Sequence, residues 1–310
     1  MNGCNATATP KDHRLTALSA STHDLGMRAE RVTGRVSYHG EGPVWWERWQ
    51  QLRFVDMFAG DVLTLNGDQV TRVNVGSPIA AVIRPRLGGG AIVARERDLA
   101  ISNFDDLSDL AGFVTLTSDE RMRSNDGGCD PDGGFWIGTL EYGFRAGAGT
   151  LYQLDAGSLR ARTVVPGLSI SNGIGWSPDS SVMYLNDSGT GITWAFDYDP
   201  VDGLSRRRVF AERADDGLPD GLCVDVEGGV WTARWGAGRV QRYDASGKLD
   251  AVIELPPSQV SACCFGGPDL ETLYITTSRE NLPEDAEPEA GSLYSFRPGV
   301  AGLPVAGFAG

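Results

Sequence analysis

The sequence predicts an all-β protein built as a six-bladed β-propeller. Short apolar runs alternate with Gly, Asp, Asn and Pro, which is typical of many short strands joined by tight turns. The same order of runs and turns recurs about every 40–48 residues, and that period with about four strands per unit is typical of propeller blades. Helical periodicity over long stretches is absent from the sequence, so no helical layer is expected.

Six copies of this pattern follow one another along the chain. The clearest copy, residues 173–196, reads Gly-Ile-Gly-Trp, a Pro-Asp turn, Val-Met-Tyr-Leu-Asn-Asp, and then Gly-Ile-Thr-Trp-Ala-Phe. The other five copies cover residues 42–65, 79–104 (the weakest), 130–154, 221–243 and 264–296. A β-sandwich would need fewer strands and no repeat, so the repeat favours the propeller.

Six blades of this size use almost the whole chain of 310 residues as one domain. We therefore expect a single propeller over residues 27–310. Residues 1–26 fall outside the repeats and are predicted to be a loose tail, from which one strand could close the ring.

The net charge of the chain is −14, from 27 Lys and Arg against 41 Asp and Glu. An acidic surface repels phosphate backbones and anionic lipids, which argues against nucleic acid and membranes as partners. No heptad and no recognisable strand edge marks a dimer face, so a monomer or a weak dimer is expected. A small molecule remains as the expected partner.

The chain is predicted to be cytoplasmic, with reduced thiols. Its first residues lack the basic and apolar regions of a signal peptide, and no apolar stretch is long enough to span a membrane. The five cysteines show no CxxC spacing, and the adjacent pair should point to opposite faces of a strand. They are Cys4, Cys129, Cys223, Cys263 and Cys264.

Polar residues recur at one phase of four different repeats, just ahead of the apolar run expected to be innermost. They are Glu41, Asn125 with Asp126, Asn172, and Asp220. Equivalent phase in a closed ring should place them around one axis. Carboxylates and carboxamides together make an oxygen-rich, negative cup that suits a hard divalent cation.

Turn formation is the alternative explanation of these residues, because Asn-Gly and Asp-Gly pairs are common in turns. It explains any one pair, but not four at matching phase, and Glu41 is not a turn former. Residues 130–134, Asp-Pro-Asp-Gly-Gly, resemble part of a calcium loop but lack its remaining ligands and its terminal Glu. We predict a β-turn there.

Other catalytic sites are poorly supplied. The chain has three histidines, and His13 and His23 fall in the predicted tail, so a histidine-based zinc site or a Ser-His-Asp triad is not expected. No Gly-x-Ser-x-Gly or dinucleotide-binding fingerprint is present. His39 should share the face of Glu41 on a strand, where it could border the site or be a structural surface residue.

Five short motifs carry a family resemblance that runs from about residue 31 to the C-terminus. They are residues 40–45 (Gly-Glu-Gly-Pro-Val-Trp), 125–127 (Asn-Asp-Gly), 171–173 (Ser-Asn-Gly), 219–221 (Pro-Asp-Gly) and 264–267 (Cys-Phe-Gly-Gly). Together they resemble the senescence marker protein-30 family, also called the gluconolactonase, regucalcin or luciferin-regenerating-enzyme-like family. The resemblance implies a six-bladed propeller with one divalent cation on the central channel axis, Ca²⁺ first, with Mg²⁺, Mn²⁺, Zn²⁺ or Fe²⁺ as alternatives.

The resemblance also assigns roles to residues of this chain. By their positions in the motifs, Glu41, Asn172 and Asp220 are similar to the family's metal ligands. Asn125 and Arg123 match its substrate contacts, and Asp220 its catalytic base. Family members hydrolyse sugar lactones, and some relatives act on other esters or on organophosphates.

The expected function is therefore that of a metal-dependent lactonase, a carboxylic ester hydrolase of the gluconolactonase type. The metal would polarise the lactone carbonyl while Asp220 activates water. One alternative is a calcium-binding regulatory protein without physiological catalysis. Another is a hydrolase of non-sugar lactones, esters or organophosphates, because loop 138–145 departs from better-known members and adds Tyr142 and Phe144 to the expected lid. A propeller used only as a protein-interaction platform would not need the axial polar set.

Overall fold

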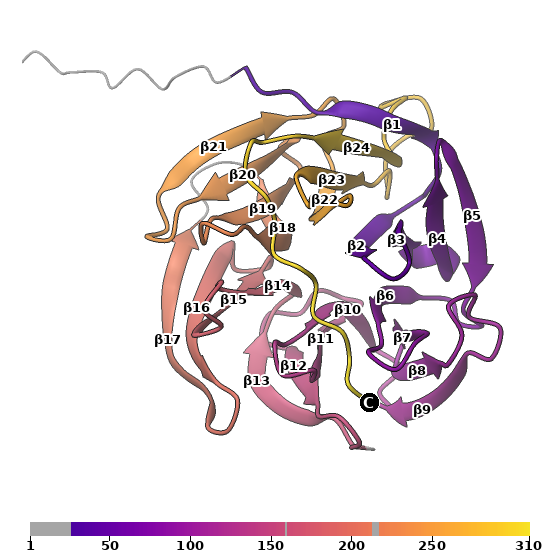
Figure 1. The fold of residues 1–310 in the computed structure, drawn as a ribbon, viewed down its shortest axis with the longest axis vertical. Coiled ribbons are helices and arrows are strands. Elements are labelled where there is room, and N and C mark those ends of the chain that lie inside the picture. Colours follow the sequence, from indigo (N-terminus) through magenta and orange to yellow (C-terminus); the bar gives the residue numbers. More distant parts are fainter. Residues whose placement is uncertain (1–25, 159, 213–216) are drawn as a thin grey trace, which may run out of the picture.

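The computed structural model describes residues 26–158, 160–212 and 217–310. Its strands form six four-stranded antiparallel sheets arranged around a central axis (Figure 1). The predicted all-β, six-bladed propeller is confirmed. Each sheet corresponds to one of the six sequence repeats, including the weak copy at residues 79–104.

The first three blades follow one another along the chain, each from its innermost to its outermost strand. Blade 1 contains β2 (Gly40–Trp46), β3 (Gln51–Asp56), β4 (Asp61–Asn66) and β5 (Gln69–Asn74), with the 3-10 helix η1 (Met57–Ala59) after β3. Blade 2 contains β6 (Ala80–Pro85), β7 (Ala91–Arg95), β8 (Asp98–Ser102) and β9 (Ala111–Thr115). Blade 3 contains β10 (Met122–Cys129), β11 (Phe135–Glu141), β12 (Gly149–Leu154) and β13 (Arg162–Leu168).

The next two blades repeat this order, and the last one combines both ends of the described chain. Blade 4 contains β14 (Ser171–Trp176), β15 (Val182–Asp187), β16 (Ile192–Asp199) and β17 (Gly203–Glu212). Blade 5 contains β18 (Leu218–Val224), β19 (Val230–Trp235), β20 (Arg239–Tyr243) and β21 (Leu249–Glu254). Blade 6 contains β22 (Val260–Gly266), β23 (Thr272–Thr277), β24 (Ser292–Phe296) and, outermost, β1 (Glu30–Arg35).

Strand β1 closes the ring. It pairs antiparallel with β24, and the Leu293 amide also donates a hydrogen bond of 3.0 Å to the Thr33 hydroxyl. The chain therefore joins its first strand to its last blade. The closing strand comes after the predicted tail of residues 1–26, of which residues 1–25 lie outside the described part of the chain.

The core lies between neighbouring blades, because each inner strand is covered on both faces. Every residue of β11 and of β22 is buried, which explains their continuous rather than alternating apolar patterns. Large side chains such as Phe54, Trp136 and Trp231 are fully buried. Burial of one such side chain contributes about 1.5–3 kcal/mol to folding.

The predicted β-turn at residues 130–134 is confirmed, and it recurs in blade 5. In blade 3, the Asp130 carboxylate accepts hydrogen bonds from the Gly134 amide (2.7 Å) and the Trp136 indole (2.7 Å). In blade 5, Asp225 accepts the corresponding bonds from the Gly229 amide (2.8 Å) and the Trp231 indole (2.8 Å). These carboxylates tie an inner turn to a core tryptophan, so a structural role accounts for them.

The C-terminal segment crosses one mouth of the central channel (Figure 1). Backbone hydrogen bonds join it to three blades: Val226 N to Ala301 O (3.0 Å), Phe308 N to Pro85 O (2.8 Å), and Ala309 N to Gly133 O (2.9 Å). No helix in the described ranges has the length and apolar character needed to cross a membrane.

Candidate metal centre

The innermost strands share an irregularity at one level of the channel. In β10, β14 and β18 the pairing register shifts between Ser124 and Gly127, between Ser171 and Ile174, and between Pro219 and Leu222. In β2 the shift comes between Glu41 and Val44. A bulge of this kind breaks the ladder locally and re-aims side chains. The structure thus places the predicted polar residues inside the innermost strands, rather than just ahead of them.

Close packing of the inner strands explains the glycines that follow these polar residues. A Cβ atom on Gly173 would lie 2.4 Å from the Leu222 nitrogen, and one on Gly221 would lie 2.4 Å from the Ala262 Cβ. Real Cβ atoms do not approach other heavy atoms so closely. The Asn-Gly and Asp-Gly pairs therefore lie in strands that only glycine allows to approach, and turn formation does not explain them.

Asn172 and Asp220, from neighbouring blades, are in direct contact. The Asn172 side-chain amide donates hydrogen bonds to the Asp220 carboxylate and, at 3.1 Å, to the Ser188 hydroxyl. Ser188 in turn donates to the Pro219 carbonyl at 2.6 Å, which anchors the pair to β18. The Asn172 carbonyl oxygen is buried and has no hydrogen-bond partner. Such an orphaned acceptor is expensive unless it has a ligand.

Glu41 faces the same region from blade 1. Its side chain is buried and accepts a hydrogen bond of 3.0 Å from the Gly42 amide. Burial, followed by the negative charge of Asp126, raises the pKa of Glu41 to about 8.

The site therefore brings together three buried carboxylates, those of Glu41, Asp126 and Asp220, and the positive charge near them does not balance their negative charge. Burial raises the pKa of Asp220 well above its usual value, and Glu41 and then Asp126 add to that rise. Burial likewise raises the pKa of Asp126, against the attraction of Arg84, whose guanidinium lies 3.7 Å away. Buried carboxylates that destabilise one another's ionised forms provide the electrostatic environment that a bound cation relieves.

The residues fit an oxygen-seeking divalent cation. Across the described ranges, no group of three or more His, Cys, Asp or Glu side chains is arranged to hold a metal ion. The predicted donor set is different: two carboxylates, Glu41 and Asp220, with the amide oxygen of Asn172. That oxygen is the buried acceptor without a partner, and such oxygen donors suit hard cations. The three-residue ligand set remains a prediction.

The two predicted substrate residues are linked to each other. Arg123 donates a hydrogen bond of 2.8 Å to the Asn125 side-chain carbonyl, and Asn125 donates one of 3.0 Å to the Ser171 carbonyl. Both side chains are buried. The guanidinium of Arg123 is close enough to Glu41 and Asp220 for their negative charges to act on it.

Aromatic rings flank Arg123. Its guanidinium carbon lies 5.4 Å from the centre of the Phe58 ring and 6.0 Å from that of Tyr142. Tyr142 belongs to the predicted lid loop and donates a hydrogen bond of 2.6 Å to Glu96. Phe144, in the same loop, is 58% exposed. The loop thus contributes Tyr142 to the wall beside the predicted substrate contacts.

His39 borders the site, which is one of its two predicted roles, and the alternative of a structural surface residue is wrong. The side chain is buried, with Nδ1 2.8 Å from the Ser278 hydroxyl and Nε2 3.8 Å from the Glu41 carboxylate. Its ring contacts those of Phe58 and Trp235 at centroid distances of 4.9 and 5.5 Å. Burial, and then the charge of Arg123, lowers the pKa of His39 to about 3, so the imidazole is neutral.

Two charged residues near the cup were missed from the sequence. Arg84 donates hydrogen bonds to the Gly42 carbonyl at 3.1 Å and the Ile83 carbonyl at 2.8 Å, beside Asp126. Glu280 has a carboxylate oxygen 3.6 Å from His39 Nδ1, and its charge acts on Arg123 and Asp220. Arg84 lies within an apolar strand and Glu280 in a loop, so neither follows the recurring polar phase. His39 differs from these two, because its spacing of two residues from Glu41 already indicated in the sequence that it could border the site.

Comparisons with known proteins agree with this architecture. Residues 39–279 match the family described as "SMP-30/Gluconolactonase/LRE-like region". The chain is similar to regucalcin from Xenopus laevis, with 34% identity over 301 residues that cover 92% of this chain and 99% of the relative.

Two solved structures resemble the chain as a whole. One, from Agrobacterium tumefaciens, is described as a calcium-binding protein, regucalcin; it shows 27% identity and a TM-score of 0.84, covering 91% of this chain and 97% of its own. The other is a luciferin-regenerating enzyme with 29% identity and a TM-score of 0.80, covering 92% of this chain and 98% of its own. The match over residues 39–279 and the regucalcin relationship show that this chain belongs to the SMP-30/gluconolactonase/LRE-like family.

Proposed function

We propose that this protein is a metal-dependent lactonase that opens sugar lactones. The observation that carries the proposal is the buried acceptor oxygen of Asn172, which has no partner although its amide contacts Asp220. It lies among buried carboxylates, with Arg123 and Asn125 nearby as donors. Membership of a family whose description includes gluconolactonase supports this reaction class.

Glu41, Asn172 and Asp220 would hold one divalent cation, with Ca²⁺ the first candidate and Mg²⁺, Mn²⁺, Zn²⁺ or Fe²⁺ the others. When bound, such an ion polarises the lactone carbonyl and lowers the pKa of water beside it. The ligands come from blades 1, 4 and 5, so the closed ring positions all three. A lactone of a sugar acid is the expected small-molecule partner.

Asp220 is the proposed general base. A carboxylate that also binds a cation is a weak base, so the cation would have to lower the pKa of the attacking water for Asp220 to take its proton. The Asn172 amide fixes the orientation of that carboxylate. Asp220 takes one proton from the attacking water, whose oxygen bonds to the carbonyl carbon. The ring C–O bond then breaks, and the proton passes from Asp220 to the leaving oxygen, which gives the hydroxy acid.

Arg123 and Asn125 are proposed to position the sugar ring. Their mutual hydrogen bond and the contact of Asn125 with the Ser171 carbonyl hold both side chains in place before substrate arrives. Preorganised donors of this kind accelerate a reaction by positioning. Phe58 and Tyr142 provide an apolar wall beside them.

Two other functions make different use of the same cup. The Agrobacterium protein is described as calcium-binding, which supports the alternative of a Ca²⁺-binding regulatory protein. The exposed Phe144 and the nearby Tyr142 favour, as a second alternative, less polar substrates such as non-sugar esters or organophosphates.

The deciding experiment measures lactone hydrolysis by metal-stripped protein. Ca²⁺, Mg²⁺, Mn²⁺, Zn²⁺ and Fe²⁺ are added one at a time, with aldonolactones of five- and six-carbon sugars as substrates and spontaneous hydrolysis subtracted. We expect turnover to return with metal and to fall by at least about 10²–10⁴-fold in Asp220→Ala. If Asp220→Asn still binds the metal but no longer turns over substrate, the result supports Asp220 as the general base.

The outcome that contradicts the proposal is confirmed metal binding without turnover of any lactone. In that case a parallel panel of aryl esters and organophosphates separates the remaining hydrolases from the calcium binder.

A further inference from the structure

A cavity of about 450 Å³ lies in the channel beside the polar cup, and Arg84 and Asp126 are among its lining residues. The innermost strands lead into it, because Leu222 and Cys223 line it and come directly after the Asp220-Gly221 pair on β18. The C-terminal residues 303–306 form part of its wall. All four described cysteines line this cavity: Cys129, Cys223, Cys263 and Cys264.

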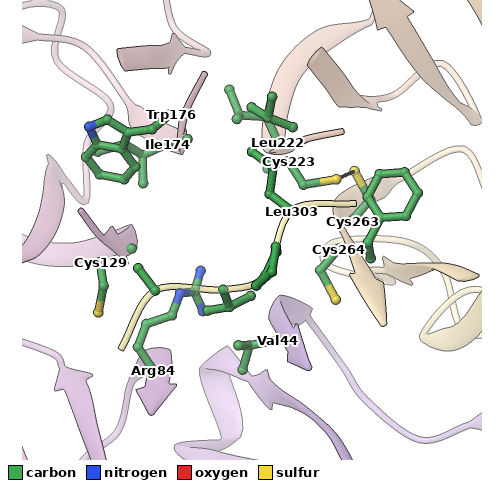
Figure 2. Close-up of a pocket in the computed structure, with 18 of the residues that line it drawn as sticks. Val44, Arg84, Cys129, Ile174, Trp176, Leu222, Cys223, Cys263, Cys264 and Leu303 are labelled. Carbon is green, nitrogen blue, oxygen red and sulfur yellow. Dashed lines mark hydrogen bonds between the residues drawn. The ribbon is translucent and has the colours of Figure 1, made fainter. Parts of the chain in front are cut away.

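Two of these cysteines face each other across a blade boundary. Cys223 lies on β18 of blade 5 and Cys263 on β22 of blade 6, and their sulfur atoms are 3.7 Å apart (Figure 2). Both are free thiols in contact as hydrogen-bonding partners. No other described cysteine pair has such a contact.

The backbones carrying the pair approach each other closely. A Cβ atom added to Gly221, two residues before Cys223, would lie 2.4 Å from the Cβ and 2.7 Å from the Cα of Ala262, the residue before Cys263. A disulfide needs Cα atoms within about 7 Å and an S–S distance of about 2.05 Å. The strands that carry the two cysteines therefore lie close together, and the sulfur atoms need to move together by less than 2 Å to reach bonding distance.

We propose that Cys223 and Cys263 form an oxidisable thiol pair that can link blades 5 and 6 by a disulfide at the cavity wall. In the reaction with hydrogen peroxide, one thiolate attacks the peroxide, water leaves, and a sulfenic acid forms. The second thiol displaces a second water from that sulfenic acid, and the S–S bond forms. Each sulfur loses one electron and each thiol one proton, while the peroxide is reduced to two waters.

The other two cysteines occupy different surroundings. Cys264 points to the opposite face of β22 from Cys263 and packs with Leu52 and Phe54, toward blade 1. Cys129 lies on β10, across the cavity (Figure 2). Cys129 therefore serves as a matched control, because it lines the same cavity without a cysteine in contact.

Burial affects the reactivity of Cys223. It raises the pKa of Cys223 well above the usual value for a thiol, and the contact with Cys263 adds to this effect. Since the thiolate is the reactive form, peroxide should attack Cys223 slowly. The cavity supplies the route by which a small oxidant reaches it.

The test uses the full chain carrying Cys4→Ser, and the same protein with Cys223→Ser, Cys263→Ser or Cys129→Ser added. Each protein is incubated with hydrogen peroxide, alkylated in denaturant without reductant, digested and analysed by mass spectrometry. We expect a linked peptide containing Cys223 and Cys263, lighter by two hydrogen atoms than its separate parts and cleaved by dithiothreitol. The Cys129→Ser protein should give the same peptide.

Thermal unfolding gives a second readout. Oxidation should raise Tm in the parent and in Cys129→Ser, and the rise should disappear in Cys223→Ser and Cys263→Ser. The proposal is overturned if prolonged oxidation leaves both thiols fully alkylatable, converts them to sulfinic acids, or links either one to Cys129 or Cys264 instead. None of these readouts depends on lactone turnover, so the result stands apart from the proposed function.

Discussion

The buried amide oxygen of Asn172 is the residue-scale feature that most directly indicates a missing partner. Its amide nitrogen has two acceptors, Ser188 and Asp220, whereas the oxygen has no donor. An amide in such a place is stable when a cation occupies the remaining side. Leucine has a similar size but offers no oxygen.

Asn172→Leu should therefore weaken divalent-cation binding by about 10–100-fold, a loss of about 1.4–2.8 kcal/mol. We expect the Asn172→Leu protein to keep its fold, because leucine fills a similar space. Isothermal titration of the metal-stripped protein measures the affinity, and Asn125→Leu is the matched control since Asn125 is not a predicted ligand. An unchanged affinity in Asn172→Leu would remove this residue from the ligand set.

Arg84 offers a second residue-scale test, because its charge opposes that of the cup. Its guanidinium lies 3.7 Å from Asp126, and its charge partly offsets the rise in the pKa of Glu41 that burial and Asp126 cause. In Arg84→Met the cup is more negative, so the metal-free protein should be less stable and should bind the cation more tightly. At an effective dielectric constant of about 20 the gain is on the order of 1 kcal/mol.

Thermal unfolding of Arg84→Met with and without Ca²⁺ measures both effects. We expect a lower Tm without metal and a larger metal-induced rise than in the wild type. An equal rise in both proteins would show that Arg84 does not influence the cation site.

At the scale of elements, the bulges of the innermost strands explain how a regular fold presents polar side chains to its axis. The register shifts in β2, β10, β14 and β18 fall at one level. Inner strands β6 and β22 carry comparable shifts, between Ala80 and Val82 and between Val260 and Ala262, where the residues are apolar or small. The fold thus repeats the geometry six times, and the side chains decide which blades supply ligands.

Gly221→Ala tests the close approach of two of these strands. The new Cβ would collide with Ala262, and overpacking of this kind costs about 1–3 kcal/mol. Chemical denaturation measures the free energy of unfolding, with Gly34→Ala in β1 as control, since a Cβ there meets no atom within 4 Å. We expect the control to change stability by less than about 0.5 kcal/mol. Equal stabilities of the two variants would contradict the packing explanation.

At the scale of the whole molecule, ring closure links both ends of the described chain to the site. Strand β1 completes blade 6, whose innermost strand β22 packs against β2, the carrier of Glu41, and against β18, the carrier of Asp220. Loss of the closing strand would expose the edge of β24 and unpair its backbone groups.

Deletion of residues 1–35 should therefore lower Tm sharply and promote aggregation, because blade 6 loses its outermost strand. Thermal unfolding and size-exclusion chromatography measure the two effects. A deletion of residues 1–25, which keeps β1 complete, is the comparison. If removal of residues 1–35 left Tm unchanged, β1 would not be needed to hold the ring.

Most of the architecture could be predicted, because it depends on local pattern and repetition. Six repeats with Gly, Asp and Pro punctuation predict six sheets, and the Asp-Pro-Asp-Gly-Gly turn at residues 130–134 is recognisable by itself. The recurring phase of Glu41, Asn172 and Asp220 pointed to one region, and the structure brings Asn172 and Asp220 into contact.

By itself, the sequence determined the all-β repeat, the family, and a set of polar residues at equivalent places, since those properties reside in spacing and residue type. Tertiary structure alone decided that His39 is buried, that Arg84 offsets Asp126, and that Cys223 meets Cys263. Each of these depends on which blades become neighbours and how closely their inner strands approach. Contacts between residues distant in sequence arise only when the ring closes, so no local pattern along the chain encodes them.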